Sequence, residues 1–134
     1  MKKLFRIMLL CATVIFAFSS CSKDETFDYP MNDLYGKWEG TGIYYKGEWI
    51  DLSNWMYQEL SFAITFKKDG TYYGEGFFGT GYGTYKAVGK NITTYVDGEK
   101  YFTYYVKSLS NDKAEITMYD NSGDSMDLRV IEIP

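Results

Sequence analysis

The chain has 134 residues, with 14 basic and 18 acidic residues, two cysteines and no histidine. This length suits one domain with one modest core, and the acidic balance argues against nucleic acid as a partner. Without histidine, a histidine-based catalytic triad and an imidazole zinc site are excluded. The carboxylates show no catalytic arrangement, so we predict no enzyme, no cofactor and no metal site.

The first 20 residues have the order of a secretory signal peptide. Residues 1–6 are positively charged, residues 7–18 are almost wholly apolar, and Ser19 and Ser20 are small. The apolar run is about a dozen residues long, whereas a membrane-spanning helix needs roughly 20. A cleaved signal peptide over residues 1–20 is therefore favoured over a transmembrane anchor.

The motif Phe18-Ser19-Ser20-Cys21 resembles the lipobox of bacterial lipoproteins, with Phe18 where that family usually has an aliphatic residue. The resemblance implies cleavage before Cys21 and acylation of its thiol, and two or three acyl chains anchor a protein stably. Cys11 leaves with the signal peptide, so Cys21 has no partner for an internal disulfide. The expected membrane contact is the lipid on Cys21.

The residues after this cysteine are polar and acidic. Ser22 fits the outer-membrane destination in that family, and residues 22–25 resemble the tether of Bacteroidetes lipoproteins exported to the cell surface. Residues 21–33 lack periodicity and are expected to form a lipidated, flexible tether. We therefore expect an outer-membrane lipoprotein, on the periplasmic or the cell-surface side, with a folded domain over residues 34–134.

The rest of the chain predicts strands in close succession. Phe62, Ile64 and Phe66 alternate with small or polar residues, as in a half-buried strand. Asp97-Gly98 is a strong hairpin signal, because both residues tolerate positive φ. The expected strands cover residues 35–45, 48–52, 61–66, 71–78, 81–88, 92–96, 101–109, 114–119 and 125–133, of which the second is short, and residues 54–57 form a loop or a helical turn.

This succession predicts an all-β fold. Parallel strands need crossover helices, and no amphipathic helix of useful length interrupts the strands, so an antiparallel meander is favoured. About eight strands in a meander close most simply into an up-and-down barrel, because closure removes the free edges. A two-sheet sandwich is the alternative.

Gly36-Lys37-Trp38 in the first strand and Arg129 in the last resemble the lipocalin superfamily, over residues 34–133. The resemblance implies a lipocalin-like barrel in which Arg129 packs across the Trp38 indole at the closed end, a favourable cation–π contact. Arg129 is out of phase with its apolar neighbours Leu128 and Val130. The pair therefore needs a bulge near Val130, and the alternative is an exposed arginine.

An eight-stranded barrel has room for its own side chains or for one small ligand. The aromatic residues expected to contact a ligand are Tyr44, Trp49, Trp55, Phe62, Phe66 and Tyr104, with Trp49 and Trp55 at a mouth or on an exposed platform. The first functional hypothesis is a module that binds a small, partly apolar ligand. The alternative is a filled barrel that serves as a surface interaction or structural module, in contact with glycan or protein.

The segment Gly74-Glu75-Gly76-Phe77-Phe78-Gly79 matches the pattern G-x-G-x-x-G. A dinucleotide site requires a helix directly after this pattern, and here another strand is expected. We therefore interpret these glycines as residues that relieve crowding or permit bends in a tightly curved sheet.

Overall fold

The structure is a computed structural model that describes residues 26–134. The predicted signal peptide and Cys21 lie outside the described residues. Within residues 26–134, no helix is long and apolar enough to cross a membrane.

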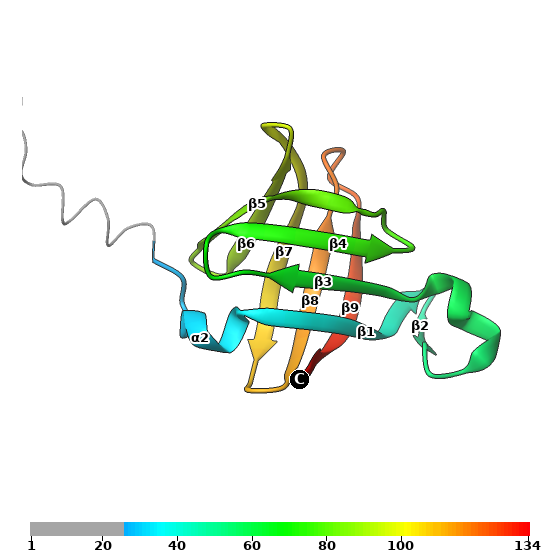
Figure 1. Ribbon diagram of the computed structural model, residues 1–134. Coiled ribbons are helices and arrows are strands. Elements are labelled where there is room, and N and C mark those ends of the chain that lie inside the picture. The colour runs from blue at the N-terminus through cyan, green and yellow to red at the C-terminus, as the bar shows by residue number, and fades with distance from the viewer. Residues whose placement is uncertain (1–25) are drawn as a thin grey trace, which may run out of the picture.

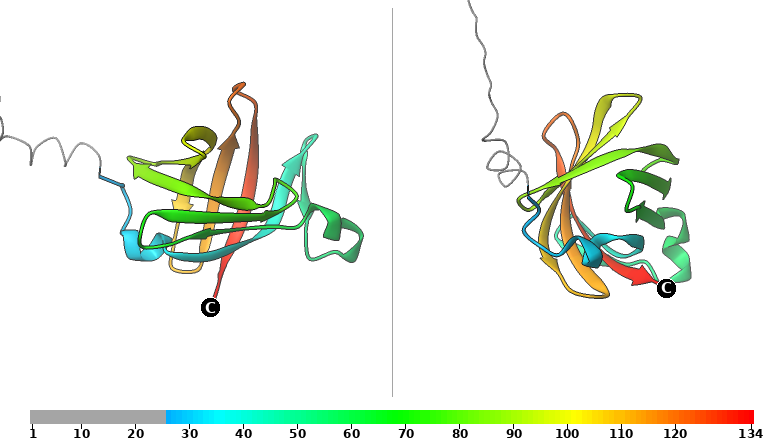
Figure 2. Two further views of the ribbon diagram at one scale, coloured as in Figure 1. Left: turned by 45° about the horizontal axis from the view of Figure 1, so that its top comes forward. Right: turned by 60° about the vertical axis from the view of Figure 1, so that its left-hand side comes forward.

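The described chain forms a closed, antiparallel, up-and-down β-barrel of eight strands, with one additional strand (Figures 1 and 2). Each barrel strand pairs with the next along the chain, and β1 pairs with β9 to close the sheet. The prediction of an all-β barrel is confirmed, and the sandwich alternative is wrong. The barrel strands are β1 (Gly36–Tyr45), β3 (Phe62–Phe66), β4 (Thr71–Gly76), β5 (Gly81–Val88), β6 (Asn91–Val96), β7 (Glu99–Leu109), β8 (Lys113–Tyr119) and β9 (Ser125–Ile133).

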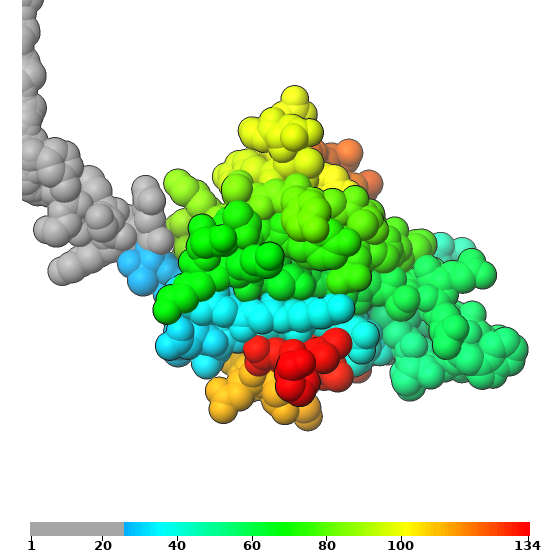
Figure 3. Space-filling model, viewed as in Figure 1, coloured from blue at the N-terminus to red at the C-terminus, as the bar shows by residue number. Residues whose placement is uncertain are grey.

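The additional strand β2 (Glu48–Asp51) pairs with the second half of β1. It leads into a 3₁₀ segment, η1 (Trp55–Leu60), where the sequence predicted a loop or helical turn. Asn54 begins this segment, because its side chain accepts a hydrogen bond from the Met56 amide. Together β2 and η1 form a lobe that protrudes from one side of the barrel (Figure 3).

Tight turns occur where the sequence predicted them. Asp97 and Gly98 have φ of 54° and 81°, as the hairpin between β6 and β7 requires. Lys46 and Gly47 make the same kind of turn between β1 and β2, with φ of 51° and 85°. These short connections force sequence neighbours to pair, which is why the topology is a simple meander.

We call the end of the barrel where β1 begins the closed end, and the end where β1 finishes the open end. The short helix α2 (Met31–Leu34) lies at the closed end (Figure 2, right), and the indole Nε1 of Trp38 donates a hydrogen bond to the Leu34 carbonyl, at 2.8 Å. Phe27 is buried and bridges to Gly89 in the turn between β5 and β6. Phe27 is therefore already packed against the barrel, although it lies within residues 21–33, which the sequence predicted to be a flexible tether.

A β-bulge in β1 changes which side chains point into the barrel. The register with β9 shifts between Gly40 and Gly42, so one residue of β1 has no paired residue in β9. Trp38 and Gly40 face inward, and beyond the bulge Ile43 is buried and Tyr44 is exposed. The prediction that Tyr44 faces the interior is wrong for this reason.

Candidate functional site

Side chains fill the closed half of the barrel. The space between Leu34, Trp38 and the neighbouring inward residues is only about 20 Å³, roughly the room that one water needs. Phe66 is buried in this half, packed edge-on against Tyr85 with ring centroids 4.9 Å apart. No ligand of more than a few atoms fits there.

A larger cavity, of about 130 Å³, lies at the open end. Residues of β3, β4, β6 and β7 line it, together with the loop of residues 77–80 between β4 and β5, which we call the β4–β5 loop. Its aromatic lining consists of Phe62, Tyr72, Phe78, Tyr101, Phe102 and Tyr104. An apolar cavity of about 150 Å³ in a protein interior holds a benzene molecule, so this cavity has the size of a single ring.

Phe78 reaches from the β4–β5 loop into the aromatic cluster. Its ring lies 5.0 Å from that of Phe62 and 6.4 Å from that of Phe102, both in edge-to-face geometry. The Tyr101 hydroxyl donates a hydrogen bond to the Phe78 carbonyl, at 3.0 Å, and Thr80 accepts one from the Gly76 amide, at 3.2 Å. The loop thus holds Phe78 as a partial cover over the cavity.

Two glycines make room for the large rings. A methyl group on Gly40 would fall within the ring of Phe62, and one on Gly83 would meet both the Tyr72 ring and the Tyr95 carbonyl. Phe62 and Tyr72 therefore lie flat against the backbone of neighbouring strands. Because these rings lie against the backbone, they line the cavity and do not fill it.

One polar group at the cavity, the hydroxyl of Tyr104, is buried without a hydrogen-bond partner among the described residues. Tyr104 is 3% exposed, and no residue in the described range 26–134 forms a hydrogen bond with its hydroxyl. Burial raises the pKa of Tyr104, and the nearby phenol groups of Tyr72 and Tyr101 raise it further. The neighbouring buried hydroxyl of Thr94 is, in contrast, satisfied by the backbone of Phe102, at 2.7 and 3.1 Å.

The predicted ligand residues divide into two groups. Phe62, Phe66 and Tyr104 point into the barrel, and Phe62 and Tyr104 line the open-end cavity. Tyr44, Trp49 and Trp55 lie outside it: Tyr44 packs edge-on against Trp49, at 5.3 Å, and Trp55 is 77% exposed on η1. Sequence reasoning missed Phe78 and Tyr101, which stand at the end and at the start of two predicted strands, 71–78 and 101–109. The structure ends β4 at Gly76, so Phe78 lies in the β4–β5 loop, and strand periodicity does not predict where a loop side chain points.

The predicted pair of Trp38 and Arg129 does not form. Trp38 is buried inside the barrel, whereas Arg129 points outward and its guanidinium lies 3.8 Å from the centre of the Trp49 ring. The bulge lies in β1, opposite Val130 and Arg129, and not in β9 itself, so Arg129 keeps its outward phase. The contact joins β9 to the additional strand β2, and so it still ties the last strand to the start of the sheet.

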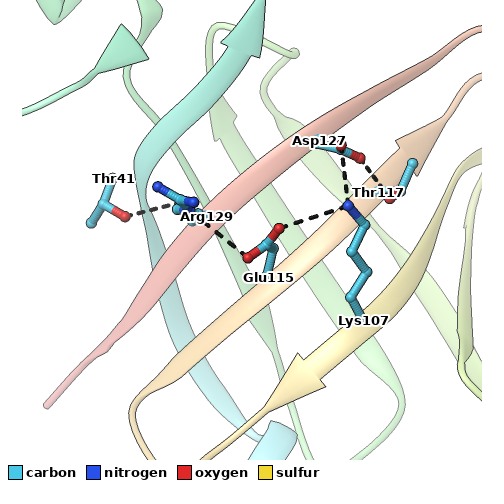
Figure 4. A network of polar contacts seen from close by, with 6 residues as sticks. All are labelled: Thr41, Lys107, Glu115, Thr117, Asp127 and Arg129. Carbon is cyan, nitrogen blue, oxygen red and sulfur yellow. Dashed lines mark hydrogen bonds and ion pairs between the residues drawn. The ribbon is translucent and has the colours of Figure 1, made fainter. Parts of the chain in front are cut away.

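Arg129 also belongs to a row of charges on the outer face of β7, β8 and β9 (Figure 4). Lys107 lies 3.1 Å from Asp127 and 3.7 Å from Glu115, and Glu115 lies 3.8 Å from Arg129. A hydrogen bond from Thr117, at 2.7 Å, is the main cause that lowers the pKa of Asp127, with Lys107 adding to it. These groups satisfy one another on a solvated surface, which is typical of a structural network.

The G-x-G-x-x-G segment is a strand end followed by a turn. Gly76 and Gly79 have φ of 100° and 111°, and β5 follows them directly. The helix that a dinucleotide site needs is absent from this part of the described chain. Residues 26–134 also contain no group of three or more acidic or cysteine side chains placed to hold a metal ion.

The fold and the cavity define the class of this protein as a small up-and-down β-barrel with a ring-sized cavity at its open end. Comparison with protein-family models, with curated proteins and with solved structures finds no match for the chain.

Proposed function

We propose that this chain is a lipid-anchored cell-envelope lipoprotein whose lipocalin-like barrel binds a small, partly apolar ligand at its open end. The observation that carries the proposal is the cavity of about 130 Å³ lined by aromatic rings. Drug-sized ligands occupy pockets of about 300–1,000 Å³, so the ligand of this barrel is no larger than one substituted ring while Phe78 is in place.

The described chain begins at the closed end of the barrel, opposite the cavity. The Thr26 carbonyl and the Asp28 amide pair with Gly89 at the closed end, at 3.0 and 2.7 Å. Cys21 stands six residues before Phe27, and six extended residues span about 20 Å at most. Lipid on Cys21 therefore keeps the closed end toward the outer membrane and leaves the open end accessible to ligand.

Two experiments test the two parts of this proposal. Cys21→Ala should move the protein from the membrane fraction to the soluble fraction, and retention in the membrane would refute the anchor. For the ligand, native mass spectrometry of protein purified from its own host should show a co-purifying small molecule that Phe78→Ala, by opening the cavity, releases or exchanges. Repeated preparations without such a molecule, together with no binding of any ring-sized probe, would refute the binding function.

A surface interaction module is the second candidate, and the protruding lobe favours it. Trp55 and Met56 are 77% and 62% exposed on η1, at the open end and away from the proposed anchor. Titration with soluble envelope polysaccharide should then quench the fluorescence of Trp55, and Trp55→Phe should remove the change. A fluorescence change that survives Trp55→Phe would place the contact elsewhere.

A further inference from the structure

The open-end cavity has a polar feature that the binding proposal does not use, the hydroxyl of Tyr104. A buried hydroxyl without a partner is destabilising, and nearly all buried polar groups in proteins are hydrogen-bonded. Tyr104 is only 3% exposed and lines the cavity, and its phenol group lies near those of Tyr72 and Tyr101, which line the cavity too. The missing partner of Tyr104 therefore has to come from inside the cavity.

The cavity also constrains the charge of its occupant. Glu75 is the one charged residue among the lining residues, and its carboxylate pairs with Lys37 at 3.3 Å on the outer side of the sheet. An ionised ligand would be buried without a counter-charge, which is strongly unfavourable. The lining rings favour a flat apolar body, so the occupant is neutral, flat and small.

We propose that the ligand is an uncharged single-ring compound with one polar substituent, such as a phenolic or carbonyl oxygen, that forms a hydrogen bond with the Tyr104 hydroxyl. This inference rests on the proposed binding function and names the ligand class of the same cavity. Phe78 and the β4–β5 loop cover the ring, and the Tyr101 hydrogen bond to the Phe78 carbonyl keeps the cover in place.

The test uses two probes of nearly equal shape, 4-fluorophenol and 4-fluorotoluene, with binding to the purified full-length protein followed by ¹⁹F NMR. Tyr104→Phe should weaken 4-fluorophenol about tenfold, which corresponds to about 1.4 kcal/mol, and leave 4-fluorotoluene unchanged. The ratio of the dissociation constants of the two probes is measured for the unmodified protein and for Tyr104→Phe. The change in this ratio isolates the contribution of the hydrogen bond. Tyr105→Phe is the matched control, because Tyr105 is the next residue of β7 and is 37% exposed; it should leave the ratio unchanged.

The outcomes separate this inference from the function on which it rests. An unchanged ratio in Tyr104→Phe would overturn the role of the hydroxyl while the ring site stands. Binding of 4-fluorobenzoate as tightly as 4-fluorophenol would overturn the neutral ligand class. Binding of neither neutral probe, to the unmodified protein or to Phe78→Ala, would overturn the binding function itself. In unmodified protein, the ring Cζ resonance of Tyr104 should shift with 4-fluorophenol and not with 4-fluorotoluene, a result that does not depend on any variant.

Discussion

Trp38→Phe should be among the most destabilising single substitutions in this barrel. Trp38 is 2% exposed, and its indole N–H is bonded to the Leu34 carbonyl at 2.8 Å, which ties α2 to β1. Phenylalanine removes this donor, and leaving a buried carbonyl without its partner costs about 1–3 kcal/mol. The smaller ring adds roughly 1 kcal/mol in lost burial and residual space.

The sum is about 3 kcal/mol, and Tm should fall by about 12 °C or more, since a domain of this size loses roughly 4 °C for each kcal/mol. Urea unfolding followed by far-ultraviolet circular dichroism measures the free energy of unfolding directly. Arg129→Ala is the matched comparison, because Arg129 contacts exposed groups and the partly exposed Trp49, and should cost less than about 1 kcal/mol. Equal losses in the two variants would refute the reasoning, because they would mean that Arg129 supports the closed end as strongly as Trp38 does.

Three further predictions concern packing and ionisation. Gly40→Ala should cost about 1–3 kcal/mol in thermal or urea unfolding, because the added methyl meets a core ring, whereas Gly81→Ala, which has open space, should be nearly neutral. Burial raises the pKa of Tyr85 from its usual 10.0 to about 12, so the folded state holds a proton that the unfolded state releases. The unfolding free energy should therefore fall as pH rises from about 10 toward 12, and Tyr85→Phe should flatten that fall. Thr117→Val should raise the pKa of Asp127 in a ¹³C carboxyl titration, because the lost hydrogen bond is the main cause of the lowered value; the stability that this lowering contributes is present above about pH 4 and disappears as pH falls through the folded pKa.

Local signals in the sequence are sufficient to predict the barrel. The strict alternation of Phe62, Ile64 and Phe66 corresponds to a strand whose three aromatic or aliphatic side chains are all buried inside. The Asp97-Gly98 turn has the positive φ values that its residues permit. Such signals act over a few residues. In a meander of short hairpins each barrel strand pairs with the next along the chain, so the positions of the strands and turns determine the topology.

The errors at Tyr44 and Trp49 have one physical origin, the bulge in β1. An extra residue between Gly40 and Gly42 reverses the inward and outward phase of the strand, which moves Tyr44 to the surface. Trp49 then follows Tyr44 to the outer face and receives Arg129. A bulge depends on the partner strand β9, about 90 residues later in the chain, and short-range periodicity contains no information about it.

The same packing that closes the barrel limits what it can bind. Aliphatic and aromatic side chains fill the closed half. At the open end, the glycines opposite Phe62 and Tyr72 let these two rings approach the backbone closely, and a cavity of about 130 Å³ remains. Phe78 occupies the position that the distal part of a larger ligand would need, and it stands between two glycines with positive φ, Gly76 just before the loop and Gly79 within it. These glycines allow the loop to change conformation at little cost, whereas the strands around it cannot move without breaking their pairing. Selectivity for small rings would therefore depend on the stability of one loop more than on the barrel wall. The Tyr101 hydrogen bond, the ring contacts of Phe78 and a few hydrogen bonds at the loop ends hold that loop in place.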